Sequence, residues 1–212
     1  MNIKKIINEI AEDIINRKRI LILVHPECFV ERWPSQYADY VSEVSNYRHS
    51  FDVIFAYQSL PEFFLKRILE RTSTAEIHNE LIQTLTSSNS SYEKDNDMLV
   101  SALKNDISEY LIENENVDIF ISGGYQDLCL REVCKNLFSI LSEEISEFGH
   151  EVKIFKQLMF HRGRVQEDQT YEKFGDTMYP AAASLDDNER VESDAWFEKL
   201  MEKKKLSMKY LL

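Results

Sequence analysis

Three cysteines are the residues with the clearest chemical potential in this chain: Cys28, Cys129 and Cys134. Cys129 comes shortly after the only pair of adjacent glycines, Gly123 and Gly124, where an apolar run passes into a helical pattern. Free backbone N–H groups in the first turn of a helix stabilise a thiolate and can also stabilise an oxyanion. Glycines allow a tight turn and a close approach of substrate. Cys129 is therefore our candidate nucleophile.

The helix predicted over residues 127–148 gives Cys129 and Cys134 different surroundings. Its apolar stripe consists of Leu130, Val133, Cys134, Leu137, Phe138, Leu141, Ile145 and Phe148. Cys134 lies within that stripe and is expected in the core, whereas Cys129 lies at its margin, where a substrate can reach it. The alternative is that Cys129 only fills the seam between helix and sheet, because free cysteines are often buried.

The elements that must position Cys129 alternate between apolar runs and helical patterns. Strands are predicted over residues 19–25, 51–57, 117–122 and 151–160. Helices are predicted over 2–17, 33–47, 62–70, 74–85, 97–113 and 193–205, besides 127–148. Residues 86–91 are typical of a Ser/Asn loop, and 162–192 are polar and irregular. This alternation predicts a three-layer α/β/α fold with a mainly parallel, Rossmann-like sheet.

Ligands of open parallel sheets bind beyond the carboxyl ends of the strands. In this sequence those positions are His25, Pro26 and Glu27 after the first strand, Gln58 and Ser59 after the second, and residues 123–129 after the third. We expect a substrate site around Cys129 that is lined by Gln58, Gly123, Gly124, Tyr125, Gln126 and Asp127.

The segment from Gly123 to Leu130, Gly-Gly-Tyr-Gln-Asp-Leu-Cys-Leu, resembles the nucleophile turn of the isochorismatase-like cysteine hydrolases. That family has a glycine, a short variable stretch and then Thr-Asp-x-Cys-Val. Gly123, Asp127 and Cys129 occupy the matching places, while Gln126 replaces the usual Thr and Leu130 the usual Val. Segments 21–29, 51–61 and 150–159 resemble the family's first strand, second strand and the strand after the cysteine helix, so the resemblance covers about residues 19–160.

The resemblance implies a cysteine nucleophile, an aspartate that activates it and a lysine beside both. Cys129 matches the nucleophile, but His25 stands at the aspartate position and Glu27 at a nearby glutamine position. Lys94 stands at about the right interval before Cys129, although Ser90–Glu93 ahead of it has little strand character. A thiol needs a base or a positive neighbour to be mostly thiolate near neutral pH, which His25 or Glu27 could supply.

Each of these residues also has a structural interpretation. His25 could make a structural hydrogen bond at the end of its strand. Glu27 and Lys94 could be solvated surface charges, and Cys28 could simply pack near the mouth of the pocket. The sequence leaves these alternatives open.

Composition narrows the partners of this 212-residue chain. It has 25 Lys and Arg against 37 Asp and Glu, a formal net charge of −12, which argues against nucleic acid and anionic membranes as partners. The 5 histidines show no metal-binding spacing, and neither a P-loop nor a GxGxxG motif occurs, so we expect no metal and no cofactor. Sparse cysteines, together with the lack of a long apolar run or a signal-peptide core, predict a cytoplasmic location.

Two functions fit this sequence. The first is an isochorismatase-like hydrolase of a small amide or related carbonyl substrate, with the α/β domain over 19–160, an N-terminal helix over 1–18 packed on it and a C-terminal extension over 161–212. The alternative is a catalytically inactive protein of the same fold that serves as a binding or assembly module. The N-terminal helix and the extension are then candidate contacts of a homo-oligomer.

Overall fold

The computed structural model describes residues 17–87, 90–94, 99–124, 129–130, 133–134, 149–160, 171–174 and 177–180. Apart from Arg17, the helix predicted over 2–17 lies outside the described residues, and so do the helix predicted over 193–205 and most of the helix predicted over 127–148.

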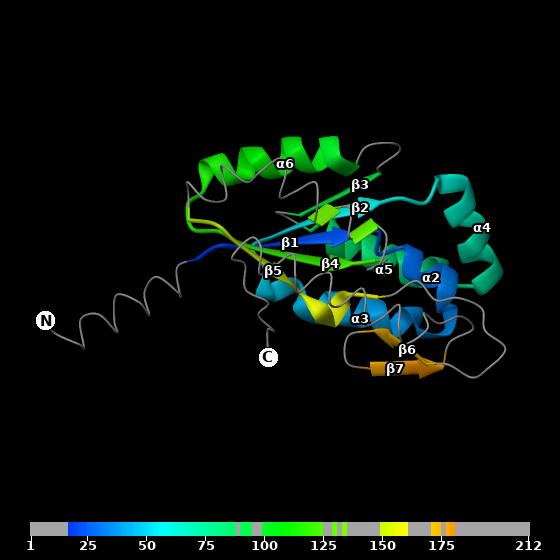
Figure 1. Ribbon diagram of the computed structural model, residues 1–212. Coiled ribbons are helices and arrows are strands. Elements are labelled where there is room, and N and C mark those ends of the chain that lie inside the picture. Colours follow the sequence, from blue (N-terminus) through cyan, green and yellow to red (C-terminus); the bar gives the residue numbers. More distant parts are fainter. Residues whose placement is uncertain are drawn as a thin grey trace, which may run out of the picture.

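Five parallel strands form the central sheet (Figure 1). They are β1 (Arg19–Val24), β2 (Val53–Gln58), β3 (Ser91–Lys94), β4 (Asp118–Gly123) and β5 (Glu151–Ile154), in the spatial order β3-β2-β1-β4-β5. This is the strand order of Rossmann-like sheets. The prediction of an α/β fold with a parallel sheet is confirmed.

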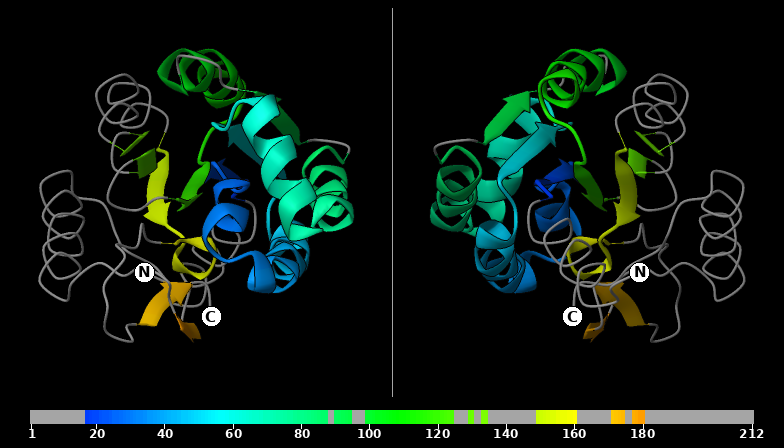
Figure 2. Two further views of the ribbon diagram at one scale, coloured as in Figure 1. Left: turned by 90° about the vertical axis from the view of Figure 1, so that its right-hand side faces the viewer. Right: turned by 90° about the vertical axis from the view of Figure 1, so that its left-hand side faces the viewer.

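Helices pack on the faces of the sheet and also lie beyond the carboxyl ends of its strands. Figure 1 shows α3 (Tyr37–Tyr47) and α5 (Ala75–Leu85) on one side of the strands and α6 (Leu99–Glu113) on the other. The short helix α2 (Cys28–Arg32) follows β1, and α4 (Glu62–Thr72) follows β2 and lies beyond the carboxyl ends of the strands (Figure 1). The view in Figure 2, left, therefore has α4 at the front. None of the helices in the described part of the chain is long and apolar enough to cross a membrane.

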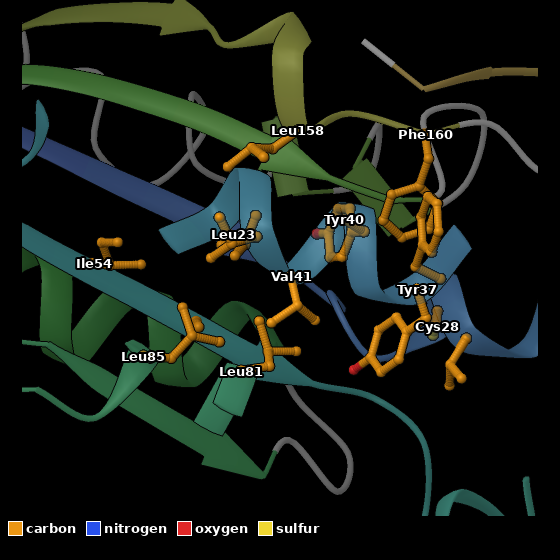
Figure 3. Close-up of a cluster of buried hydrophobic side chains, with 14 of the residues drawn as sticks. Leu23, Cys28, Tyr37, Tyr40, Val41, Ile54, Leu81, Leu85, Leu158 and Phe160 are labelled. Carbon is orange, nitrogen blue, oxygen red and sulfur yellow. The ribbon is translucent and has the colours of Figure 1, made fainter. Parts of the chain in front are cut away.

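Side chains of the central strands alternate between two buried clusters. Leu21 and Leu23 of β1 belong to the cluster with α3 and α5, which Figure 3 shows in part. Ile20, Ile22 and Val24 belong to the cluster that includes α6 residues. Because both faces are covered, β1 is apolar at successive positions rather than at every second one, as the sequence predicts. Each fully buried aliphatic side chain of this kind stabilises the fold by about 1.5–3 kcal/mol.

The largest departure from the predicted elements is β3. The sequence predicts a loop over 86–91 and a poor strand over Ser90–Glu93, whereas Ser91–Lys94 forms an edge strand. It pairs with β2 in parallel, from Phe55 opposite Ser91 to Gln58 opposite Lys94. The neighbouring strand supplies the pairing that this polar segment does not specify by its own hydrophobic pattern.

Two further segments differ from expectation. The strand predicted over 151–160 ends at Ile154 and is followed by a 3-10 turn, Lys156–Leu158. Segment 162–192, expected to be irregular, contains an antiparallel hairpin of β6 (Tyr171–Phe174) and β7 (Thr177–Pro180). Its strands are linked in sequence by Gly-Asp, a pair suited to two-residue hairpin connections.

Candidate functional site

The carboxyl edge of the sheet has a topological switch point between β1 and β4. The chain passes from β1 to β2 and β3 on one side and then crosses to β4 on the other. Ligands of open α/β sheets bind at such points. His25 follows β1 with a φ of 49°, a left-handed conformation that is uncommon outside glycine. Local strain of this kind clusters at functional sites.

The two glycines at the end of β4 are packed against their neighbours. The backbone N–H of Gly124 donates to the Val24 carbonyl oxygen (2.9 Å), and the N–H of Phe160 donates to the Gly123 carbonyl oxygen (3.1 Å). A Cβ on Gly123, whose φ is 101°, would lie 2.1 Å from the Val24 oxygen, and one on Gly124 would lie 2.2 Å from Phe160 Cε2. Gly123 is therefore favoured by both its backbone conformation and its contact with Val24, and a side chain at position 124 would have to displace the Phe160 ring.

The imidazole of His25 is buried at this edge. Neither of its ring nitrogens has a hydrogen-bond partner among the described residues. Burial lowers the pKa of His25 to about 4, so the ring is neutral near pH 7. A neutral imidazole supplies no positive charge to a thiolate, which weakens the Cys–His pairing that the sequence suggests.

Glu27 is fully buried, contrary to its interpretation as a solvated surface charge. Its Oε1 accepts hydrogen bonds from the backbone N–H groups of Ser59 (2.7 Å) and Leu60 (2.9 Å), in the turn after β2. Its Oε2 has no hydrogen-bond partner among the described residues. Burial raises the pKa of Glu27 to about 7, although the two backbone hydrogen bonds oppose the shift. The carboxyl group can therefore gain or lose a proton near neutral pH.

Three buried tyrosines are close enough to Glu27 for its charge to act on them, and the sequence alone does not identify them as site residues. Burial raises the pKa values of Tyr37, Tyr40 and Tyr92, and the Glu27 carboxylate contributes to each shift. Tyr37 Oη lies 2.8 Å from His78 Nδ1, whereas the Tyr92 hydroxyl has no hydrogen-bond partner within the described residues. Tyr37 and Tyr40 lie on the inward face of the predicted helix over 33–47. The sequence pattern could have indicated these two hydroxyls as members of a buried polar site, because a buried Tyr O–H usually has a hydrogen-bond partner.

The three cysteines differ in their surroundings. Cys134 is fully buried, as predicted, and burial raises the pKa of its thiol to about 12. Cys28 is also buried, with Sγ 3.7 Å from Glu27 Oε1. Burial raises its pKa well above the ordinary value, and negative charge on Glu27 and Cys129 adds to the effect. Cys129 is half-buried and lies in a π-helical turn, so it is the most accessible of the three.

The other candidate residues are Gln58 and Lys94, at the ends of β2 and β3, and Tyr125, Gln126 and Asp127. Gln58 is buried, and its Nε2 donates to the Leu60 carbonyl oxygen (2.8 Å), which closes the turn after β2. Lys94 is the last residue of β3 and lies opposite Gln58 in the parallel register. Tyr125, Gln126 and Asp127 lie outside the described residues. The carboxyl edge thus brings together Gln58, Lys94 and the residues that follow β1.

Comparison with known proteins does not identify this site. No family model matches the chain, and no significant match was found among curated proteins. Within the described ranges, no group of three or more His, Cys, Asp or Glu side chains is arranged to hold a metal ion. The described residues thus offer two groups for chemistry, the half-buried Cys129 thiol after β4 and the buried Glu27 carboxyl group after β1, whose pKa is near neutrality.

Proposed function

We propose that the protein is a hydrolase with a three-layer, isochorismatase-like fold that acts on a small amide or related carbonyl substrate. Cys129 is the nucleophile and Glu27 transfers the protons. The observation that carries this proposal is the Glu27 carboxyl group, which is buried at the carboxyl edge with a pKa raised to about 7. A group whose pKa lies near the working pH serves best as both general base and general acid.

The first half of the reaction would form a thioester. The Glu27 carboxylate accepts the proton of the Cys129 thiol while Sγ forms a bond to the carbonyl carbon of the substrate. The carbon–nitrogen bond then breaks, and Glu27 gives its proton to the departing amine.

The second half would release the acid and restore the enzyme. Glu27 accepts a proton from water as the water oxygen bonds to the thioester carbon. The carbon–sulfur bond breaks, and Glu27 returns the proton to the Cys129 thiolate. No proton is gained or lost by the protein over the cycle.

Glu27 is preferred over His25 for this role because of their pKa values. His25, with a pKa of about 4, is a weak base at neutral pH, whereas Glu27, with a pKa of about 7, is partly ionised there. Lys94 at the end of β3 is the candidate for the lysine that the family resemblance implies. In this proposal it stabilises the thiolate by its positive charge.

An activated ester separates the two proposed roles. p-Nitrophenyl acetate has a leaving group that needs no proton, so acylation of Cys129 should give a burst of nitrophenolate followed by slower turnover. Cys129→Ala should abolish the burst. Glu27→Gln should slow the burst and slow the steady rate by about 100-fold, because Glu27 accepts the thiol proton in the first half and the water proton in the second. Mass spectrometry of the stalled Glu27→Gln protein should locate the acetyl group on Cys129.

Cys134→Ser provides the matched control, since this cysteine is fully buried. Its burst and turnover should equal those of the wild type once folding is confirmed. The proposal fails if Cys129 is not acylated faster than Cys28 and Cys134. It also fails if Glu27→Gln turns over as fast as the wild type.

The second candidate function is a catalytically inactive protein of the same fold that serves as a binding or assembly module. One observation favours it: the family's aspartate position holds His25, which burial keeps neutral. This reading predicts that Cys129 reacts with the ester no faster than an ordinary cysteine.

A further inference from the structure

Helix α4 exposes an unusual pair of aromatic side chains. Phe63 and Phe64 are 63% and 56% exposed, and their ring centroids lie 5.5 Å apart. The Arg67 guanidinium lies 5.4 Å from the centre of the Phe63 ring, and Arg71 follows one turn later. We call these four residues the α4 surface. Exposed apolar groups rimmed by charges are typical of interaction sites.

Helix α6 carries the other exposed apolar site. An open hollow of ≈ 370 Å³ is lined by Asn105, Ser108, Glu109, Ile112 and Glu113. Ile112 is 62% exposed. We call these five residues the α6 surface. Phe63, Phe64 and Ile112 are the large hydrophobic side chains that stand out as exposed among the described residues, so the two surfaces together account for all of them.

The two surfaces match in charge and in spacing. The α4 surface has arginines at positions 67 and 71, and the α6 surface has glutamates at 109 and 113. Residues four apart on a helix lie on the same face, one turn above the other. Two basic groups on one helix can therefore face two acidic groups on the other, while the phenylalanines meet the hollow around Ile112.

The two surfaces lie at opposite ends of the strands, one near the carboxyl ends and the other near the amino ends. Helix α4 follows the carboxyl end of β2, whereas the end of α6 that carries Glu109 and Glu113 leads to the amino end of β4 (Figure 1). One chain therefore does not join its own two surfaces. We propose that the α4 surface of one molecule docks on the α6 surface of a second copy of this chain.

Such a contact is head-to-tail, because each molecule offers a different surface to each of its two neighbours. Contacts of this kind build closed rings or open chains of subunits rather than symmetric dimers. The proposal is independent of the hydrolase activity, since it uses neither Cys129 nor Glu27. It also differs from an oligomer formed through the N-terminal helix or the C-terminal extension.

Charge reversal on each surface tests the contact by analytical ultracentrifugation. Arg67→Glu with Arg71→Glu, and separately Glu109→Lys with Glu113→Lys, should weaken self-association by about tenfold or more, because like charges would then face each other. A mixture of the two variants should assemble again, because each reversed surface meets its complement. This recovery also shows that both variants are folded.

Glu76→Lys with Glu80→Lys on α5 is the matched control, since both glutamates are exposed and four residues apart. It makes the same change in net charge as the α6 variant and should leave assembly unchanged. The proposal is overturned if the wild type stays monomeric up to about 100 μM, because specific interfaces associate at micromolar or lower concentrations. It is equally overturned if the control loses assembly, or if the mixture does not recover it.

Discussion

The ring of Phe160 occupies the space that a side chain at Gly124 would need: a Cβ there would lie 2.2 Å from Phe160 Cε2. Phe160 is itself fully buried and packs edge-on against Phe29, Trp33 and Tyr40, with centroid distances of 5.4, 5.8 and 5.7 Å. Figure 3 shows Phe160 close to Tyr40 in this cluster. Close-packed interiors transmit such a clash instead of absorbing it. Gly124, five residues before the candidate nucleophile in the sequence, is thus packed against the aromatic core.

Gly124→Ala should therefore lower the free energy of unfolding by about 1–3 kcal/mol, the usual cost of overpacking. Urea unfolding followed by circular dichroism measures the change. Adding Phe160→Leu to Gly124→Ala should cost less than the sum of the two single changes, because a smaller side chain makes room for the new methyl group. Strict additivity of the two substitutions would contradict this account.

Glu27 should make stability fall as the pH rises. Its pKa is raised from 4.5 to about 7 in the folded protein, so the folded state binds this proton more tightly than the unfolded state. The stabilisation is complete below pH 4.5 and is lost as the pH rises through 7, to the extent of about 3 kcal/mol. Glu27→Gln retains an oxygen for the Ser59 and Leu60 N–H groups and should remove this dependence.

The measurement is the free energy of unfolding in urea at several pH values, taken as the difference between wild type and Glu27→Gln. That difference should change in favour of the variant between pH 5 and 8. A difference that stays constant with pH would mean that Glu27 is not titrating in this range.

Sequence patterns predict the strands well and the site only in part. Ile20 to Val24 form a continuous apolar run, and such a run is specific enough for a buried parallel strand. Strand β3 is not predictable in this way, because its pairing with β2 is a long-range contact. Glu27 is missed as a buried residue for a similar reason. The N–H groups that satisfy its Oε1 come from Ser59 and Leu60, more than 30 residues away.

His25 should make stability fall in acid. Burial lowers its pKa from 6.5 to about 4, so below pH 6.5 the unfolded state binds this proton more readily than the folded state. The associated stability is present above pH 6.5 and is lost as the pH falls through 4. His78, with a pKa also lowered to about 4, adds in the same direction.

Substitution separates the two histidines. His25→Asn is suitable because asparagine tolerates the left-handed backbone of this position. The variant should lose less stability than the wild type between pH 7 and 5, and His78→Gln should remove a further part of the decrease. Burial also lowers the pKa of His150, which contributes in the same direction. NMR titration should show both imidazoles neutral at pH 6. An imidazole of His25 that titrates near 6.5 would contradict its burial without a charged partner.

The last prediction concerns Asp118, the first residue of β4, at the amino ends of the strands and away from the candidate site. Its carboxylate pairs with the buried Lys153 ammonium group and with Arg17, whose Nε lies 2.7 Å from Oδ1. Asp118→Ala should cost about 3–5 kcal/mol, because it leaves the buried ammonium with only the partly exposed Glu151 carboxylate, 3.1 Å away. Lys153→Met should cost less, since it removes the charge and leaves Asp118 paired with Arg17.

The two substitutions can be combined to isolate the pair. The Asp118→Ala, Lys153→Met variant lacks the Lys153 ammonium group. Its loss in free energy of unfolding should therefore be no larger than that of Asp118→Ala alone, and well below the sum of the two single losses. Urea unfolding of all four proteins at pH 7 gives the coupling energy. Independent effects would show that Lys153 is stabilised chiefly by its contact with the Phe120 ring, whose centroid lies 5.4 Å from Nζ.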